Sequence, residues 1–250
     1  MLINPNTSRA TTAMMTAIAA RTLGSVEDMA ARGGAGRGLT VRGLTVRGVT
    51  VRQGPSMLLD EEALRGAVPE VVAAGRRAVA AGNCAALLVG AFGDPGVEEL
   101  RAFADVPVVG LAEAACAEAA AGGVRFGVAT TTPGLVDAIG RRIEALGLAG
   151  RFTGVRLTAA GDPRRLAGEP EAMREELADA VRACVVRDGA RAVVIGGGPL
   201  AEAADVLRER FEIPVVAPVP AACRRIAREL AASDPAGGQA DDPEAGAGRP

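Results

Sequence analysis

The sequence contains no histidine, lysine, tyrosine or tryptophan, and all 28 of its basic residues are arginine. Without these side chains the chain cannot form a Ser-His-Asp triad, a histidine general base, a lysine Schiff base or a lysine-containing phosphate loop. A histidine-ligated metal is excluded for the same reason. Any proton transfer must therefore use Asp, Glu, Cys, a hydroxyl group, water or an external cofactor.

Aromatic residues and net charge are also scarce. Five phenylalanines are the only aromatic residues, and 28 basic against 30 acidic residues give a formal charge of −2. Nucleic-acid binding typically needs a basic surface and stacking platforms, so we expect no nucleic-acid partner. No apolar run reaches the length of a membrane span, and the N-terminus lacks the pattern of a signal peptide, so we expect no membrane partner. Four widely spaced cysteines then indicate reduced thiols and a cytoplasmic location.

Short β-type runs alternate with longer helical stretches, which predicts an α/β fold with mainly parallel sheets flanked by helices. An internal repeat divides this pattern into two halves. Residues 87–91 align with 193–197, and residues 106–110 align with 213–217. We therefore predict two pseudo-symmetric lobes, residues 1–121 and 122–231, with the C-terminal helix at 218–231 assigned to either lobe. Residues 232–250 have the composition of a disordered tail.

Four loops follow the carboxyl ends of predicted strands, at residues 4–8, 91–96, 130–132 and 196–199. Ligands of open parallel sheets bind beyond the carboxyl ends of the strands. We therefore expect these loops to converge on a cleft between the two lobes.

A pentapeptide occurs three times in tandem between residues 38 and 52, as Gly-Leu-Thr-Val-Arg twice and then Gly-Val-Thr-Val-Arg. An odd period turns successive copies to opposite faces of a strand, so one strand cannot contain all of them. We predict that the last copy forms the strand. The preceding residues 24–37, rich in Gly, Ala and Arg, are predicted to be a loop.

Several motifs in register carry a family resemblance. They are Ile3-Asn-Pro-Asn-Thr-Ser8, Gly54-Pro-Ser56, Val89-Gly-Ala-Phe-Gly-Asp-Pro-Gly96 and Pro107-Val-Val-Gly-Leu-Ala-Glu-Ala-Ala115. Together they resemble the hydantoin/allantoin racemase branch of the aspartate/glutamate racemase superfamily, from residue 1 to about residue 231. The resemblance implies a two-lobed α/β enzyme that uses no cofactor, acts on a small molecule and assembles as a homo-oligomer.

The resemblance also implies a mechanism in which two cysteines face each other across the cleft. One thiolate removes the proton from the stereocentre, and the other thiol returns a proton to the opposite face. The corresponding positions here are Ala91 and Gly197, which can do neither. Cys116 and Cys223 occupy equivalent places in the two halves, but their alanine-rich helices favour core packing over catalysis.

The predicted cleft keeps polar but uncharged groups. Gly196 to Gly198 precede a helix, and their N–H groups could hold an anion or a carbonyl. The nearest acids, Asp94 and Glu113, are candidate proton carriers. Each also has a structural interpretation, Asp94 as the N-cap of the helix starting near residue 97 and Glu113 as a complement to a helix dipole. The expected substrate contacts are Asn6, Thr7, Ala91, Phe92, Thr130, Thr131, Gly197 and Gly198.

Three functions fit this sequence. The first is a cofactor-independent isomerase, cyclase or lyase of unconventional mechanism, acting on a small amino-acid-derived acid or cyclic amide. The second is a residual hydantoin-type racemase that uses an unconventional base. The third is a non-catalytic homologue that binds a small molecule. No metal-ligand constellation and no nucleotide-binding glycine motif after a strand is recognisable, so we expect neither a metal nor a cofactor.

Overall fold

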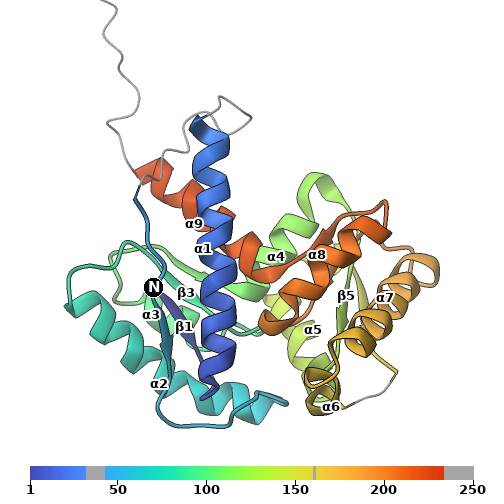
Figure 1. Ribbon diagram of the computed structural model, residues 1–250, viewed down its shortest axis with the longest axis horizontal. Coiled ribbons are helices and arrows are strands. Elements are labelled where there is room, and N and C mark those ends of the chain that lie inside the picture. Colours follow the sequence, from blue (N-terminus) through green and yellow to red (C-terminus); the bar gives the residue numbers. More distant parts are fainter. Residues whose placement is uncertain (32–42, 160–161, 234–250) are drawn as a thin grey trace, which may run out of the picture.

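The chain folds into two four-stranded parallel sheets with helices packed around them (Figure 1), in a computed structural model that describes residues 1–31, 43–159 and 162–233. The first sheet has the order β2-β1-β3-β4 and the second the order β6-β5-β7-β8. The two orders are equivalent, as the internal repeat predicts, and the α/β class is confirmed. The strands are β1 (Leu2–Asn4), β2 (Gly48–Thr50), β3 (Leu87–Val89), β4 (Val108–Gly110), β5 (Phe126–Thr130), β6 (Phe152–Leu157), β7 (Ala192–Ile195) and β8 (Val215–Val216).

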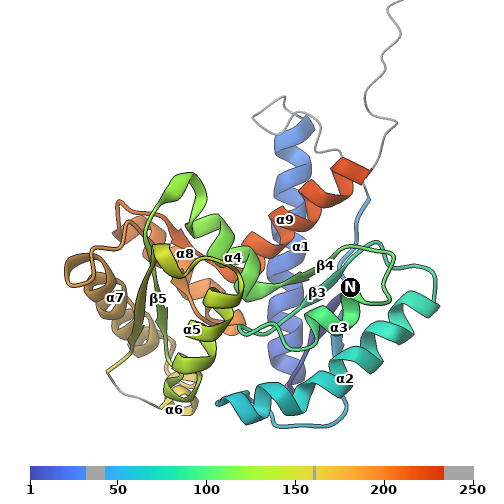
Figure 2. The same ribbon diagram turned by 180° about the vertical axis from the view of Figure 1, so that it is seen from behind.

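Helices follow most strands and cover the sheets. In Figure 1, α2 and α3 lie on the side of the first sheet, α7 and α8 lie on the side of the second, and α4 lies between them. The C-terminal helix α9 packs against α1 and α4, which both views show (Figures 1 and 2). The helices are α1 (Arg9–Ala31), α2 (Glu61–Ala80), α3 (Val97–Arg101), α4 (Leu111–Ala119), α5 (Val136–Ala145), α6 (Pro163–Ala167), α7 (Pro170–Val186), α8 (Ala201–Arg210) and α9 (Pro218–Ser233).

The inner strands are short apolar runs that are buried throughout. Leu-Leu-Val in β3 and Ala-Val-Val-Ile in β7 are buried at every residue, as expected for parallel strands covered on both faces. The edge strand β2 is the last pentapeptide copy, as predicted, and pairs with β1 with Ile3 opposite Val49. Gly48 is required there because a Cβ atom would lie 2.2 Å from Oγ1 of Thr16 on α1.

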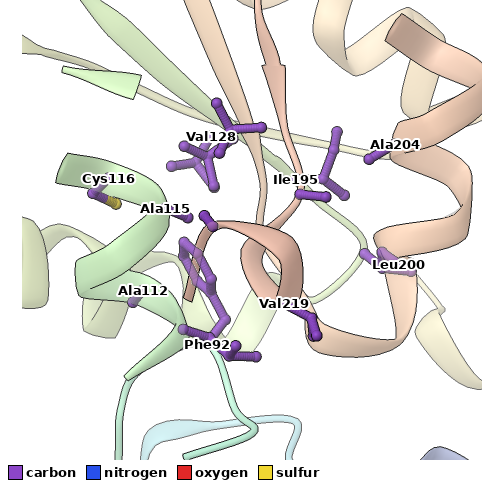
Figure 3. Packing of buried hydrophobic residues seen from close by; sticks show 14 of the residues in the cluster. Phe92, Ala112, Ala115, Cys116, Val128, Ile195, Leu200, Ala204 and Val219 are labelled. Carbon is purple, nitrogen blue, oxygen red and sulfur yellow. The ribbon is translucent and has the colours of Figure 1, made fainter. Parts of the chain in front are cut away.

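One hydrophobic cluster connects both sheets. It includes Leu88 of the first sheet and Val128 of the second, with α4 and α9 contributing Ala115 and Val219. Figure 3 shows Phe92, from the loop after β3, in this shared packing. The chain changes from one sheet to the other between Gly110 and Phe126, but the core does not divide there.

Two predicted boundaries are wrong. Residues 24–31 belong to α1 and not to a loop, because the Ala, Met and Glu residues after Gly24 favour helix, and one exposed helical glycine costs only about 1 kcal/mol. Residues 232 and 233 end α9 and do not begin the tail. The rest of the predicted loop, 32–37, and of the predicted tail, 234–250, lies outside the described residues.

Candidate functional site

A cavity of about 440 Å³ lies where the four predicted loops meet. Its volume is in the range of small-molecule sites, about 300–1,000 Å³. Polar side chains come from both lobes, namely Asn6, Ser8, Thr11, Ser56, Thr131 and Thr132. The larger apolar side chains are Met14, Met57, Leu58, Leu64, Phe92, Leu135, Met173 and Leu200. Within the described part of the chain, no Asp, Glu, Arg or Cys side chain lines the cavity.

The loop after β1 is organised by a buried asparagine. The side-chain amide of Asn4 donates to Oδ1 of Asn6 at 2.9 Å and to Oγ1 of Thr12 at 2.9 Å. Oδ1 of Asn6 also accepts from the N–H of Ser8 at 2.9 Å. Among the described residues Nδ2 of Asn6 has no acceptor, so this group can donate to a ligand. Ser8 caps α1 by accepting from the N–H of Thr11 at 3.2 Å.

Thr7 lies next to the cavity but does not line it. Its N–H donates to the carbonyl of Pro55 at 3.0 Å, and its hydroxyl donates to the carbonyl of Gly54 at 3.4 Å. These bonds hold the Gly54-Pro-Ser56 motif beside the loop after β1. Ser56 thereby reaches the cavity, together with Met57 and Leu58.

In the second lobe, β5 and β7 are held together at their carboxyl ends. The buried hydroxyl of Thr130 donates to the carbonyl of Gly196 at 2.7 Å, so Thr130 supports the site without lining it. Gly196 permits this close approach, because a Cβ there would lie 2.8 Å from Cγ1 of Val128. Gly197 donates its N–H to the carbonyl of Ile195 at 2.9 Å. The N–H groups of Gly196 and Gly197 thus have backbone acceptors, whereas no acceptor for the N–H of Gly198 is found among the described residues. The N–H of Gly198 is therefore available to a ligand.

Asp94 and Glu113 do not line the cavity. Asp94 accepts hydrogen bonds from the N–H groups of Ala112 at 2.7 Å and Glu113 at 2.9 Å, so it caps α4 and not the helix that follows it in sequence. Gly110 makes room for this cap, because a Cβ there would lie 2.2 Å from Cγ of Asp94. Burial raises the pKa of Asp94 to about 6, and desolvation outweighs the opposing effect of Arg142.

Glu113 is the third residue of α4 and complements the start of that helix, as its structural interpretation requires. Its Oε1 accepts from the N–H of Gly110 at 3.1 Å, and the guanidinium groups of Arg101 and Arg142 bind its two oxygens. Both candidate proton carriers are thus engaged in hydrogen bonds and ion pairs outside the cavity wall.

Comparisons with known proteins identify the family. The Asp/Glu/Hydantoin racemase family model matches residues 1–226. The chain belongs to this racemase family. Hydantoin racemases from Pseudomonas sp. (strain NS671) and Paenarthrobacter aurescens are 32% and 31% identical to it, over 52% and 59% of its residues. The matches span 52% and 61% of the length of those two relatives.

Solved structures extend the likeness to nearly the whole chain. Allantoin racemase from Klebsiella pneumoniae aligns with this chain with a TM-score of 0.77 and 25% sequence identity. The alignment covers 93% of this chain and 87% of that racemase. A Gly74Cys mutant of arylmalonate decarboxylase has a TM-score of 0.59 and 18% identity, and covers 92% of each chain. The second likeness concerns the fold alone.

The two positions to which the racemase resemblance assigns thiols, Ala91 and Gly197, both lie on the cavity wall. At Gly197 the space for a side chain is taken, because a Cβ would lie 2.9 Å from Cδ1 and 3.1 Å from Cγ of Leu200. Leu200 lines the cavity and belongs to the shared core (Figure 3). The absence of a side chain at residue 197 therefore does not widen the cavity, because Leu200 occupies that space.

The cysteines present in this racemase-family chain lie elsewhere. Cys116, Cys184 and Cys223 are buried, and none of them lines the cavity. Burial raises the pKa of Cys184 and of Cys223 to about 12 and also raises the pKa of Cys116. Core packing is thus confirmed for Cys116 and Cys223, and their thiols stay protonated at neutral pH.

The described residues contain no group of three or more Cys, Asp or Glu side chains arranged to hold a metal ion. Among the helices of the same residues, none is both long and apolar enough to cross a membrane. Five further residues line the cavity and were not predicted from the sequence, namely Thr11, Met14, Leu135, Met173 and Leu200. They lie within or just before helices, where their spacing resembles ordinary core packing.

Proposed function

We propose that this member of the racemase family binds a small neutral cyclic amide or ureide in the cavity and supplies no side-chain base for two-thiol racemisation. The observation that carries this proposal is the composition of the cavity wall, which is mainly apolar, carries hydroxyl and amide groups, and has no charged side chain among the described residues. A carboxylate that moved from bulk water into this cavity would find no cation to pair with, so its binding would carry a large desolvation cost. A ring amide can exchange hydrogen bonds with hydroxyl, amide and backbone groups at much lower cost.

The polar groups have the donor and acceptor properties that such a ring requires. Nδ2 of Asn6 and the N–H of Gly198 can donate to ring carbonyls, and the hydroxyls of Thr131 and Thr132 can donate or accept. Apolar side chains such as Phe92 and Leu58 can pack against the ring and its substituent. The hydantoin racemases that this chain resembles carry a ring of this class in their name.

Binding is tested by titration calorimetry and by thermal shift. A 5-substituted hydantoin and allantoin should raise the melting temperature, and the open-chain N-carbamoyl amino acid, aspartate and glutamate should not. Thr131→Val keeps the side-chain shape and removes a cavity hydroxyl, so it should weaken binding roughly fivefold to tenfold. Thr153→Val is the matched control, because Thr153 donates to the carbonyl of Phe126 and does not line the cavity.

The reaction is tested separately. An enantiopure 5-substituted hydantoin incubated with the protein in deuterated buffer should keep both its C5 proton and its optical rotation. Exchange at C5 would instead support the residual racemase with an unconventional base. Tight binding of the free acids, without any response to the ring compounds, would contradict the proposed ligand class.

A second candidate is an isomerase, cyclase or lyase in which water carries the proton. The observation that favours it is that Gly198, for whose N–H no acceptor is found among the described residues, lines the same cavity as several hydroxyl side chains. Such donors can stabilise an oxyanion. A change in the NMR spectrum of a bound ring compound, other than deuterium exchange at C5, would identify this activity. Asp94 and Glu113 would then be dispensable as proton carriers.

A further inference from the structure

A buried ion-pair cluster joins the two lobes beside the cavity. Arg142, on α5 of the second lobe, donates from Nε to Oδ2 of Asp94 at 3.0 Å and from Nη2 to Oε2 of Glu113 at 3.2 Å. The side chains of Asp94 and Glu113 are 0% and 3% exposed, and that of Arg142 is 16% exposed. Charges this deeply buried are stable only when they are paired and hydrogen-bonded. The three residues are called the interlobe clamp below.

The clamp is attached to both walls of the cavity. On one side, Asp94 follows Ala91 and Phe92 in the loop after β3, and its N–H donates to the carbonyl of Ala91 at 3.1 Å. On the other side, α5 begins directly after Leu135, which lines the cavity together with Thr131 and Thr132. Arg142 lies two turns along the same helix. Because α5 is a continuous helix, the position of Arg142 fixes the position of the cavity wall formed by Thr131, Thr132 and Leu135.

The conformation of the loop that carries Asp94 depends on contacts made by the side chain of Asp94. Asp94 has φ 54°, a left-handed conformation that a non-glycine residue adopts at a cost of about 1 kcal/mol or more. Its carboxylate bonds to Ala112, Glu113 and Arg142 maintain this conformation. Arg142 is the only clamp residue in the second lobe. Loss of its bond to Asp94 therefore removes the contact through which the clamp connects this loop to the second lobe.

We propose that Arg142 is a positioning residue that sets the separation of the two cavity walls, so that ligand affinity depends on a side chain that does not line the cavity. The proposal rests on the proposed function for its ligand, a 5-substituted hydantoin. Other charged groups facing the clamp come from two further elements. Glu98 and Arg101 lie on α3, and Arg225 lies on α9, where it approaches Glu113 at 3.5 Å. Three carboxylates thus meet three guanidinium groups, and Arg225 also pairs with Glu229 of α9 at 2.7 Å.

The chain offers a matched control one residue away. Arg141 also crosses between the lobes, pairing with Glu61 of α2, but both side chains are about half exposed, at 55% and 46%. Solvent-exposed pairs of this kind contribute little. Arg142→Gln and Arg141→Gln therefore remove the same charge from the same helix, and only the first disrupts the clamp.

The test measures two properties of the full-length chain and these variants. The first is hydrogen–deuterium exchange without ligand, followed by mass spectrometry over residues 91–96 and 131–136. The second is the Kd of a 5-substituted hydantoin from calorimetry. Arg142→Gln should increase the exchange rate of both segments about fivefold or more and raise the Kd about tenfold or more. Arg142→Lys should lie between it and the native chain, since an ammonium group cannot bridge both carboxylates in the same way. Arg141→Gln should stay within about twofold.

The two proposals fail in different ways. If the native chain binds no ring compound, the proposed function is wrong, and the exchange data alone decide the clamp. Native-like exchange and affinity in Arg142→Gln would overturn the clamp, and so would an equal effect of Arg141→Gln. If Arg142→Gln does not fold, Arg142→Lys replaces it, and native-like exchange in that variant overturns the clamp.

Discussion

From the shape of the cavity wall, we predict that introducing thiols at residues 91 and 197 requires a third substitution. Ala91→Cys and Gly197→Cys place sulfur at the two positions that the family resemblance assigns to the proton carriers. At residue 197 the new Cβ would lie 2.9 Å from Cδ1 and 3.1 Å from Cγ of Leu200. Carbon atoms in contact prefer about 3.5–4.0 Å. Rotation about the Cβ–Cγ bond of Leu200 moves Cδ1 but not Cγ, so the 3.1 Å contact remains unless the rest of the side chain shifts. Leu200→Ala is the change that makes room.

The energetic consequence can be worked out for each variant. Overpacking a filled site costs about 1–3 kcal/mol, so Ala91→Cys/Gly197→Cys should be destabilised by that amount. Leu200→Ala alone removes a core side chain that is 8% exposed and should cost about 2–3 kcal/mol, near the lower end for a buried leucine because one side of it faces the cavity. In the triple variant the cysteine at 197 partly refills that space. Urea unfolding should therefore find the triple variant more stable than Leu200→Ala.

The assay follows the C5 proton of an enantiopure 5-substituted hydantoin in deuterated buffer, by NMR and polarimetry. The native chain should cause neither exchange nor inversion. Ala91→Cys, with one thiol, should cause exchange without inversion, because a single base returns deuterium to the face from which it took the proton. The triple variant should cause exchange with inversion, because the second thiol acts on the other face.

A serine version provides the control. Ala91→Ser/Gly197→Ser/Leu200→Ala has nearly the same shape, but its hydroxyls are far weaker acids than thiols, so it should cause no exchange. The reasoning is refuted if Ala91→Cys/Gly197→Cys, with Leu200 intact, is as stable as the native chain and racemises as fast as the triple variant.

Three further predictions concern the protein without ligand. The pKa of Asp94, raised from 3.8 to about 6, exceeds its value in the unfolded chain, so the free energy of unfolding should fall by about 2 kcal/mol as the pH rises from about 4 to about 6. Urea unfolding of the native chain and Asp94→Asn at both pH values should show that this decrease is absent from the variant. Gly134→Ala would place a Cβ 2.5 Å from the carbonyl oxygen of Leu59 and should lower the free energy of unfolding by about 1–3 kcal/mol, whereas Gly140→Ala, in open space, should raise it by up to about 1 kcal/mol. A thiol reagent should label the half-buried Cys84 in the native protein and all four cysteines after denaturation; labelling of a second thiol in the native state would contradict the burial of the other three.

The sequence was sufficient to predict the fold class and the place of the cavity. Both follow from local patterns, since apolar runs define the inner strands, and the carboxyl ends of parallel strands share one edge. The loops at 4–8, 91–96, 130–132 and 196–199 do supply the cavity wall. The limit of α1 was not predictable, because one glycine in a helix-favouring context is compatible with either structure.

The roles of individual site residues depend on contacts that are distant in sequence. Asp94 caps a helix that starts 17 residues later, and its partner Arg142 is 48 residues away. No local pattern signals such a pairing. Thr130 and Thr131 are adjacent in sequence, but the first bonds to Gly196 and the second faces the cavity. The obstruction of residue 197 by Leu200 likewise depends on the turn between β7 and α8.

Because the edge strand β2 lies in the last copy of a tandem repeat, a change in the number of copies need not remove the strand. Five positions earlier the chain has Gly43, Leu44 and Thr45, which correspond to Gly48, Val49 and Thr50 of β2 and differ from them only at the second residue. Replication slippage that adds or removes one copy of the repeat would therefore leave an equivalent segment to pair with β1. The change in length would fall in the chain before the strand and would leave the cavity loops unaltered. Natural variants that differ in copy number should accordingly share the same site.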